Sequence, residues 1–242
     1  MTGNSTQHHP AAVRGNQRVH LTDGEVHFLW WFIRGSMMNP DTRRQLRQAW
    51  GMCSRHAAGL LAVEAAFRQG RMQASALLYL DLIERAVGAI TSRGPFAEVR
   101  AARRLDTHGP CLMCELRVAG AASGGAPADL LTLGRDSIQL TWSANESRRY
   151  WEPLVCRDCR VGAAGPRCRV HLVAHAQSVR PDELAPERAA LGHIYRHLVR
   201  YARSFRMEHP GVDTPEDRAA LVEAVGWCSG WSGLFGMFEG PA

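Results

Sequence analysis

The stretch GMCSRHAAGLLAVEAAFRQGRMQASALLYLDLIERAVGAITS, residues 51–92, combines a pair of potential metal ligands with two helices. Cys53 and His56 open it, and apolar residues then recur at steps of three and four, the period of an α-helix. We predict one helix from the Cys53 turn to Gly70 and a second from Ser75 to Ser92. The predicted buried face of the second comprises Leu80, Ile83, Val87 and Ile90.

The chain on both sides of this stretch continues the helical pattern. Thr22 and Glu25 have the spacing of a capping box and precede a predicted helix, Val26 to Met38. Pro40 starts the next helix, which runs to Trp50, because the first helical turn does not need its missing N–H. Further helices are expected near Ala128–Trp142, Glu146–Leu154 and Leu184–Glu208, and after Thr214 with Pro215 in the first turn. Strand-like alternation is limited to Ser137–Trp142, so the prediction is an all-α, irregular multi-helix bundle.

Six of the seven cysteines fall into pairs with a second ligand three positions away. A C-x2-C or C-x2-H step lets both side chains reach one ion, and two such steps complete a tetrahedral zinc shell. The sequence therefore predicts two zinc ions per chain. The eight candidate ligands are Cys53, His56, Cys111, Cys114, Cys156, Cys159, Cys168 and His171.

Short motifs resemble an uncharacterised family of bacterial cysteine-rich helical proteins. They are Asn39-Pro40, Gly51 to Ala57, Ala76 to Leu82 and Arg203 to Gly211. The unit of that family runs C-P-x-C, a helical segment with N-D-P, then G-F-C-x-x-H-x-W, and its chains end in Y-R-F-R-x-E-P-x-G. The resemblance implies a helical fold of two degenerate units with metal ligation, and no particular activity. This chain departs from it in having His8-His9-Pro10-Ala11 where the first C-P-x-C belongs, and in closing the second unit with a cysteine pair.

Three pairings of the four ligand pairs remain open. The family spacing favours a four-cysteine site of Cys111, Cys114, Cys156 and Cys159, which leaves the Cys53 and Cys168 pairs to form a second site. The main alternative joins the Cys156 and Cys168 pairs, since eight residues separate them, and leaves the Cys53 pair to meet the Cys111 pair. Zinc suits either arrangement, and an iron–sulfur cluster is an alternative on an all-cysteine site.

Four segments are expected along the 242 residues. They are a disordered N-terminal arm (1–21), a first helical unit (22–105), a second, zinc-knuckle unit (106–180) and a C-terminal helical pair with an aromatic tail (181–242).

The composition and the cysteine usage indicate in which cellular compartment the chain belongs. No apolar run is long enough to span a membrane, and the polar N-terminus does not match a secretory signal. Paired cysteines without a secretory context favour metal ligation in a reducing, bacterial cytoplasm. The net charge of +6 results from 29 arginines, no lysine and 23 acidic residues. Because these arginines alternate with acidic residues, the composition favours a genome that encodes arginine in place of lysine over a polyanion-binding tail.

Other features are weaker pointers to function. His193 and His197 are one helical turn apart but lack the adjacent Glu of H-E-x-x-H, so a structural role is favoured. We predict that Cys228 is an inert thiol in the core. The aromatic, glycine-rich run Trp227–Phe238 does not favour a helix, and it either folds over the core or exposes an apolar patch. Arg196, Arg200 and Arg203 share one helix face that can meet phosphates.

These features favour a zinc-binding, non-enzymatic regulatory or adaptor module with a protein partner. One alternative is a nucleic-acid-binding regulator that uses the arginine helix. Another is a metalloenzyme or iron–sulfur redox protein with an incomplete site. Whether the chain is an enzyme is left open. Closed four-ligand sites would argue against catalysis, whereas an incomplete site would argue for it.

Overall fold

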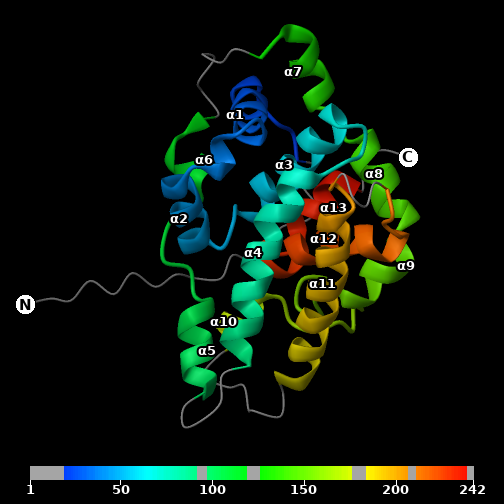
Figure 1. The fold of residues 1–242 in the computed structure, drawn as a ribbon. Helices are drawn as coiled ribbons and strands as arrows, with labels where there is room; N and C mark the ends of the chain where they lie inside the picture. Colours follow the sequence, from blue (N-terminus) through cyan, green and yellow to red (C-terminus); the bar gives the residue numbers. More distant parts are fainter. Residues whose placement is uncertain (1–18, 92–96, 119–125, 176–183, 207–210, 239–242) are drawn as a thin grey trace, which may run out of the picture.

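The computed structural model describes residues 19–91, 97–118, 126–175, 184–206 and 211–238. Within these ranges the chain is helical and has no β-strand, which confirms the all-α fold (Figure 1). The first half contains α1 (Asp23–Ile33), the 3-10 helix η1 (Ser36–Met38), α2 (Pro40–Ala49), α3 (Ser54–Phe67), α4 (Gln73–Ile90), α5 (Ala97–Leu105) and α6 (Leu112–Glu115). The second half contains α7 (Ala128–Gly134), α8 (Ile138–Glu146), α9 (Arg148–Trp151), the 3-10 helix η3 (Glu152–Leu154), α10 (Arg169–Ala174), α11 (Ala185–Arg203), α12 (Pro215–Ser229) and α13 (Ser232–Phe238).

The predicted helix starts are confirmed by their caps. The Thr22 hydroxyl accepts from the Glu25 N–H at 3.3 Å, and the Glu25 carboxylate accepts from the Thr22 N–H at 2.8 Å. Asn39 caps α2 through a 2.8 Å hydrogen bond from the Asp41 N–H, and Pro40 occupies the first turn. Thr214 opens α12 with a second capping box. Each cap satisfies backbone donors that the helix itself leaves free.

Several sequence expectations were wrong in detail. The expected helix Ala128–Trp142 is two helices, because α7 ends at Gly134 and the Asp136 carboxylate caps the Ile138 N–H at 2.8 Å to start α8. The strand-like stretch from Ser137 lies mainly in α8, where tertiary packing overrides its alternation. Helices α5 and α10 were not predicted, since each is shorter than three turns.

Two almost entirely buried helices form the centre of the molecule. Helix α3 is buried continuously from His56 to Ala66, and α12 from Ala219 to Ser229. A helix that is apolar on all sides must be covered on all sides. Helix α11 packs against both α4 and α12, while α13 packs against α3 (Figure 1). On α4, the expected buried residues Leu80 and Val87 are only half-buried.

The C-terminal aromatic run folds back over this core. It forms the end of α12 and all of α13, so the expectation that its glycines prevent a helix was wrong. Trp231 is 1% exposed and stacks between Trp151 and Phe235, each with its ring centroid 6.0 Å away. Gly226 lies directly beneath the Trp231 indole, where a Cβ would overlap the ring. Gly226 therefore serves close packing.

The predicted arm 1–21 lies almost wholly outside the described residues, and the four-segment division stays a prediction. Helix α11 ends at Arg203, short of the expected Glu208, which is itself outside the described residues. Among the described helices, none combines the length and apolar character that a bilayer crossing requires.

Candidate metal centres

The four ligand pairs meet two by two. Cluster 1 consists of Cys53, His56, Cys111 and Cys114, and cluster 2 of Cys156, Cys159, Cys168 and His171. In each cluster one ligand atom per residue lies within 4.8 Å of all the others. The favoured pairing through the family spacing was therefore wrong, and the main alternative describes the structure. Each cluster is Cys3His, so the all-cysteine site expected for an iron–sulfur alternative does not form among the described residues.

Tertiary contacts explain the pairing of cluster 1. The Trp50 indole N–H donates to the Asp106 carbonyl at 2.9 Å, and the His108 N–H donates to the Gln48 carbonyl at 2.9 Å. These two bonds fasten the segment before Cys111 beside the end of α2, immediately ahead of Cys53. Cluster 2 needs no distant segment, because a short loop joins its two pairs.

Three of the four pairs begin a helix in the same way. Cys53, Cys111 and Cys168 are the N-cap residues of α3, α6 and α10. The second ligand of each pair therefore lies in the first helical turn, on the same side as the first. Free N–H groups and the positive end of the helix dipole favour thiolate charge there. The remaining pair closes a tight turn, in which the Cys159 N–H donates to the Cys156 carbonyl at 3.0 Å.

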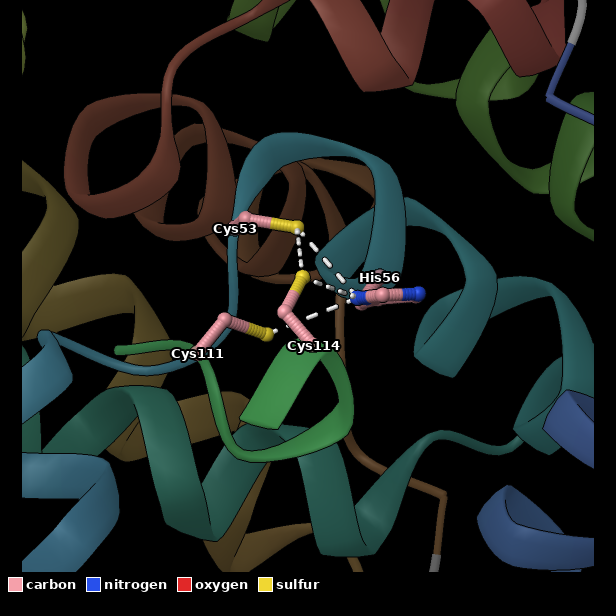
Figure 2. Close-up of side chains that lie close together, drawn as sticks. All are labelled: Cys53, His56, Cys111 and Cys114. Carbon is pink, nitrogen blue, oxygen red and sulfur yellow. Dashed lines mark hydrogen bonds between the residues drawn. The ribbon is translucent and has the colours of Figure 1, made fainter. Parts of the chain in front are cut away.

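Cluster 1 has the dimensions of a tetrahedral metal shell (Figure 2). His56 Nδ1 lies 3.3 Å from Cys53 Sγ, 3.5 Å from Cys111 Sγ and 3.4 Å from Cys114 Sγ. The sulfurs of Cys53 and Cys114 are 3.9 Å apart. A tetrahedral zinc ion, with Zn–S of about 2.3 Å and Zn–N of about 2.0 Å, separates its ligands by about 3.5 Å (S···N) and about 3.8 Å (S···S). The four side chains therefore fit such an ion.

Cluster 2 has the same dimensions in a more buried setting. His171 Nδ1 lies 3.5, 3.4 and 3.3 Å from the sulfurs of Cys156, Cys159 and Cys168, and the Cys159 and Cys168 sulfurs are 3.7 Å apart. Cys156 and Cys168 are buried, whereas Cys114 of cluster 1 is exposed. Cluster 1 is therefore the more accessible to solvent and chelators.

Without a cation, each cluster favours one thiolate. In cluster 1 the hydrogen bond from Cys53 lowers the pKa of Cys111 to about 3, while the same contact, together with burial, raises the pKa of Cys53. In cluster 2 hydrogen bonds from Cys159 and Cys168 lower the pKa of Cys156. The hydrogen bond with Cys156 in turn raises the pKa of Cys159 to about 12. Repulsion opposes a second thiolate, and a central divalent cation removes that repulsion.

A buried carboxylate orients the histidine of cluster 1. Glu25 is 1% exposed, and its Oε1 lies 2.9 Å from His56 Nε2, on the side of the ring away from the sulfurs. Burial opposes ionisation of Glu25, yet hydrogen bonds from Arg55, the Thr22 N–H and His56 outweigh it and lower its pKa to about 2. Because an ionised carboxylate accepts, Nε2 carries the proton and the Nδ1 lone pair faces the cluster. Glu25 thus completes the capping box of α1 and is also the outer hydrogen-bond partner of His56, a candidate ligand.

Glu25→Gln is expected to weaken metal binding at cluster 1 about 10- to 100-fold and to leave cluster 2 unchanged, because it removes the charge that orients His56. Metal release into a chelator, followed over time, should show one phase for each cluster. The substitution should accelerate only the phase from cluster 1. Glu152→Gln is a matched control, since Glu152 is an exposed carboxylate that pairs with Arg148 at the surface. This role of Glu25 would be contradicted if both substitutions accelerated metal release equally, or if neither accelerated it.

The turn between α12 and α13 contacts the surroundings of both clusters. The Ser54 hydroxyl, next to Cys53, accepts from the Gly233 N–H at 2.6 Å and donates to the Gly230 carbonyl at 3.2 Å. The backbone N–H of Trp231 donates to the Cys159 sulfur of cluster 2. The turn between α12 and α13 therefore lies beside both clusters.

Arg169, next to Cys168, binds two segments from within the interior. It is 6% exposed, and its guanidinium donates to the carbonyls of Cys228 at 2.8 Å and Leu105 at 2.9 Å, and to the Thr107 hydroxyl at 3.0 Å. Burial lowers its pKa. The fork of arginine can serve these separate acceptors at once, which lysine cannot. Cluster 2 is thereby tied to the ends of α5 and α12.

The remaining sequence candidates have varied outcomes. Cys228 is buried outside both clusters, and burial raises its pKa to about 12, in line with an inert thiol. A neighbouring histidine, His175, is exposed and bonds to the His171 carbonyl, outside cluster 2. Arg196, Arg200 and Arg203 are exposed on α11.

Sequence reasoning missed acidic partners of the α11 histidines. His193 and His197 form a third group with Glu216 of α12. No local motif links these residues, because the acid comes from the next helix.

No family model matches the chain, and comparisons with curated proteins and with solved structures give no match either. The family resemblance stays a prediction.

Proposed function

We propose that the chain is a zinc-binding helical module that acts by binding a partner, as a regulator or adaptor, and that its two cysteine clusters are structural. One observation carries this proposal. Each cluster presents four ligand atoms at the edge lengths of a tetrahedron, so an ion there has no position left for substrate or water. Three sulfurs and one imidazole are a donor set that zinc prefers.

The cysteine chemistry supports a reducing compartment. All seven cysteines are free thiols, and the sulfur separations of 3.7 and 3.9 Å within the clusters are far longer than the about 2.05 Å of a disulfide. Thiolates must stay reduced to ligate zinc. We therefore propose the bacterial cytoplasm as the setting.

Exposed aromatic residues support a protein partner. Trp31 and Trp142 are 54% and 56% exposed, whereas most of the large apolar side chains in the described residues are in the core. Tryptophan is enriched at protein interfaces because it supplies a large area at small entropy cost. The second candidate, a nucleic-acid binder, is favoured by the exposure of Arg196, Arg200 and Arg203 on one helix. Polyanion binding that falls steeply with added salt would favour that candidate over the first.

Cobalt(II) titration of tag-free, metal-free, reduced protein tests the two structural sites. Charge-transfer absorption from thiolate to cobalt should grow until two ions per chain are bound, and zinc should displace both. Because the ligands must lose protons, the affinity should fall as the pH is lowered. Saturation at one ion, or an iron chromophore in protein as purified, would overturn the assignment of two closed zinc sites.

A further inference from the structure

Helices α11 and α12 bring four titratable side chains together away from the cysteine clusters. His193 and His197 are four residues apart on α11, and Glu216 and Glu223 are seven apart on α12. These spacings place each pair on one face of its helix. Since α11 and α12 pack against each other, the two faces meet, and the imidazole centroids lie 4.5 Å apart.

Three of these residues offer converging ligand atoms. His193, His197 and Glu216 each have one nitrogen or oxygen within 4.8 Å of the others. His197 Nε2 lies 3.5 Å from Glu216 Oε1. Two imidazoles and a carboxylate are the protein donors of many open metal sites.

Asp217 holds one of the imidazoles in a ligating orientation. Its Oδ1 lies 2.8 Å from His197 Nδ1, and its other oxygen accepts from the Thr214 N–H at 3.1 Å as part of the α12 cap. Because a carboxylate accepts from Nδ1–H, Nε2 keeps its lone pair and faces Glu216. The capping box thus fixes the histidine from behind, as Glu25 does in cluster 1.

Glu223 is an independent sign of a missing cationic partner. Its side chain is 0% exposed, and neither carboxylate oxygen has a hydrogen-bond partner among the described residues. Oε2 points towards His193 Nε2 at 3.7 Å, which is too long for a hydrogen bond. A buried carboxylate without a partner is costly, and in natural proteins such a group calls for a specific explanation.

We propose that His193, His197 and Glu216 bind a divalent transition-metal ion, with Glu223 as the adjacent buried negative charge. Two carboxylates and two neutral imidazoles balance the charge of such an ion. Unlike the cysteine clusters, this set of three ligands leaves a coordination position for water or a small anion. His193 and Glu216 are only half-buried, so that position is reachable from solvent.

Calorimetric titration with zinc tests this third site in protein whose cysteine clusters are already filled with zinc. The wild type should show one further binding event. His193→Gln removes a ligand and should weaken it at least about 100-fold, whereas Glu223→Gln removes an outer partner and should weaken it about 10- to 100-fold. Glu152→Gln, at an exposed carboxylate elsewhere, should bind as the wild type does.

A fold check keeps the test decisive. The thiolate-to-cobalt absorption of each variant should match the wild type, which shows that the cysteine clusters and the fold persist. If Glu223→Gln does not fold, the half-buried His193→Gln still tests the site. Absence of a further event in the wild type, or unchanged affinity in His193→Gln, would overturn the third site. If the wild type shows no thiolate-to-cobalt absorption, the two structural sites are overturned instead.

Discussion

Cys168→Ser is expected to abolish metal binding at cluster 2 and to lower the free energy of unfolding by more than about 4 kcal/mol. Cys168 is 1% exposed, caps α10 and lies 3.3 Å from His171 Nδ1. Serine is a poor zinc ligand, and the binding free energy of a structural ion contributes directly to folding. The loop between Cys159 and Cys168 carries no helix, so we expect it to lose its conformation with the ion. Urea unfolding together with metal analysis measures both effects.

Cys228→Ala is the matched control, because Cys228 is also a buried thiol but lies outside both clusters. It should keep every bound ion and cost no more than about 2 kcal/mol. If Cys168→Ser kept its metal, or if both substitutions destabilised the chain equally, cluster 2 would not be a structural metal site.

Gly233→Ala is expected to lower the free energy of unfolding by about 3 kcal/mol and to loosen metal binding at cluster 1. A Cβ at Gly233 would overlap the backbone carbonyl of Ser54, which cannot move without shifting Cys53. The same displacement would break the 2.6 Å hydrogen bond from the Gly233 N–H to the Ser54 hydroxyl. Overpacking of this kind typically costs about 1–3 kcal/mol, and the lost hydrogen bond adds to it. Thermal unfolding and chelator competition at cluster 1 check the two parts.

Gly88→Ala provides the comparison for a glycine in open space. Gly88 is exposed within α4, and a Cβ there would meet no heavy atom of the described residues within 4 Å. Alanine at this position should stabilise the chain by about 0.5–1 kcal/mol, since it restricts the unfolded state and suits a helix. Equal effects at both glycines would mean that α13 does not pack closely against Ser54.

Helix starts could be predicted well because their signals are local. The Thr22–Glu25 and Thr214–Pro215 patterns act within four residues, and the structure has both caps. Gly226 and Gly233 misled the prediction for the aromatic tail. Their lack of a side chain weakens a helix locally, but here it allows close contact with Trp231 and Ser54, and burial of the aromatic rings outweighs the lower propensity.

By itself, the sequence determined the all-helical fold and the residues that form the two cysteine clusters, because helical periodicity and two-residue ligand spacing are short-range properties. The tertiary structure alone decided which pairs meet. Hydrogen bonds such as Trp50 to the Asp106 carbonyl bring Cys111 beside Cys53, and no local pattern encodes a contact between residues 56 positions apart. Tertiary packing also brought Glu25 to His56 and Glu223 towards His193, since an acid and an imidazole on different helices become partners only when those helices pack.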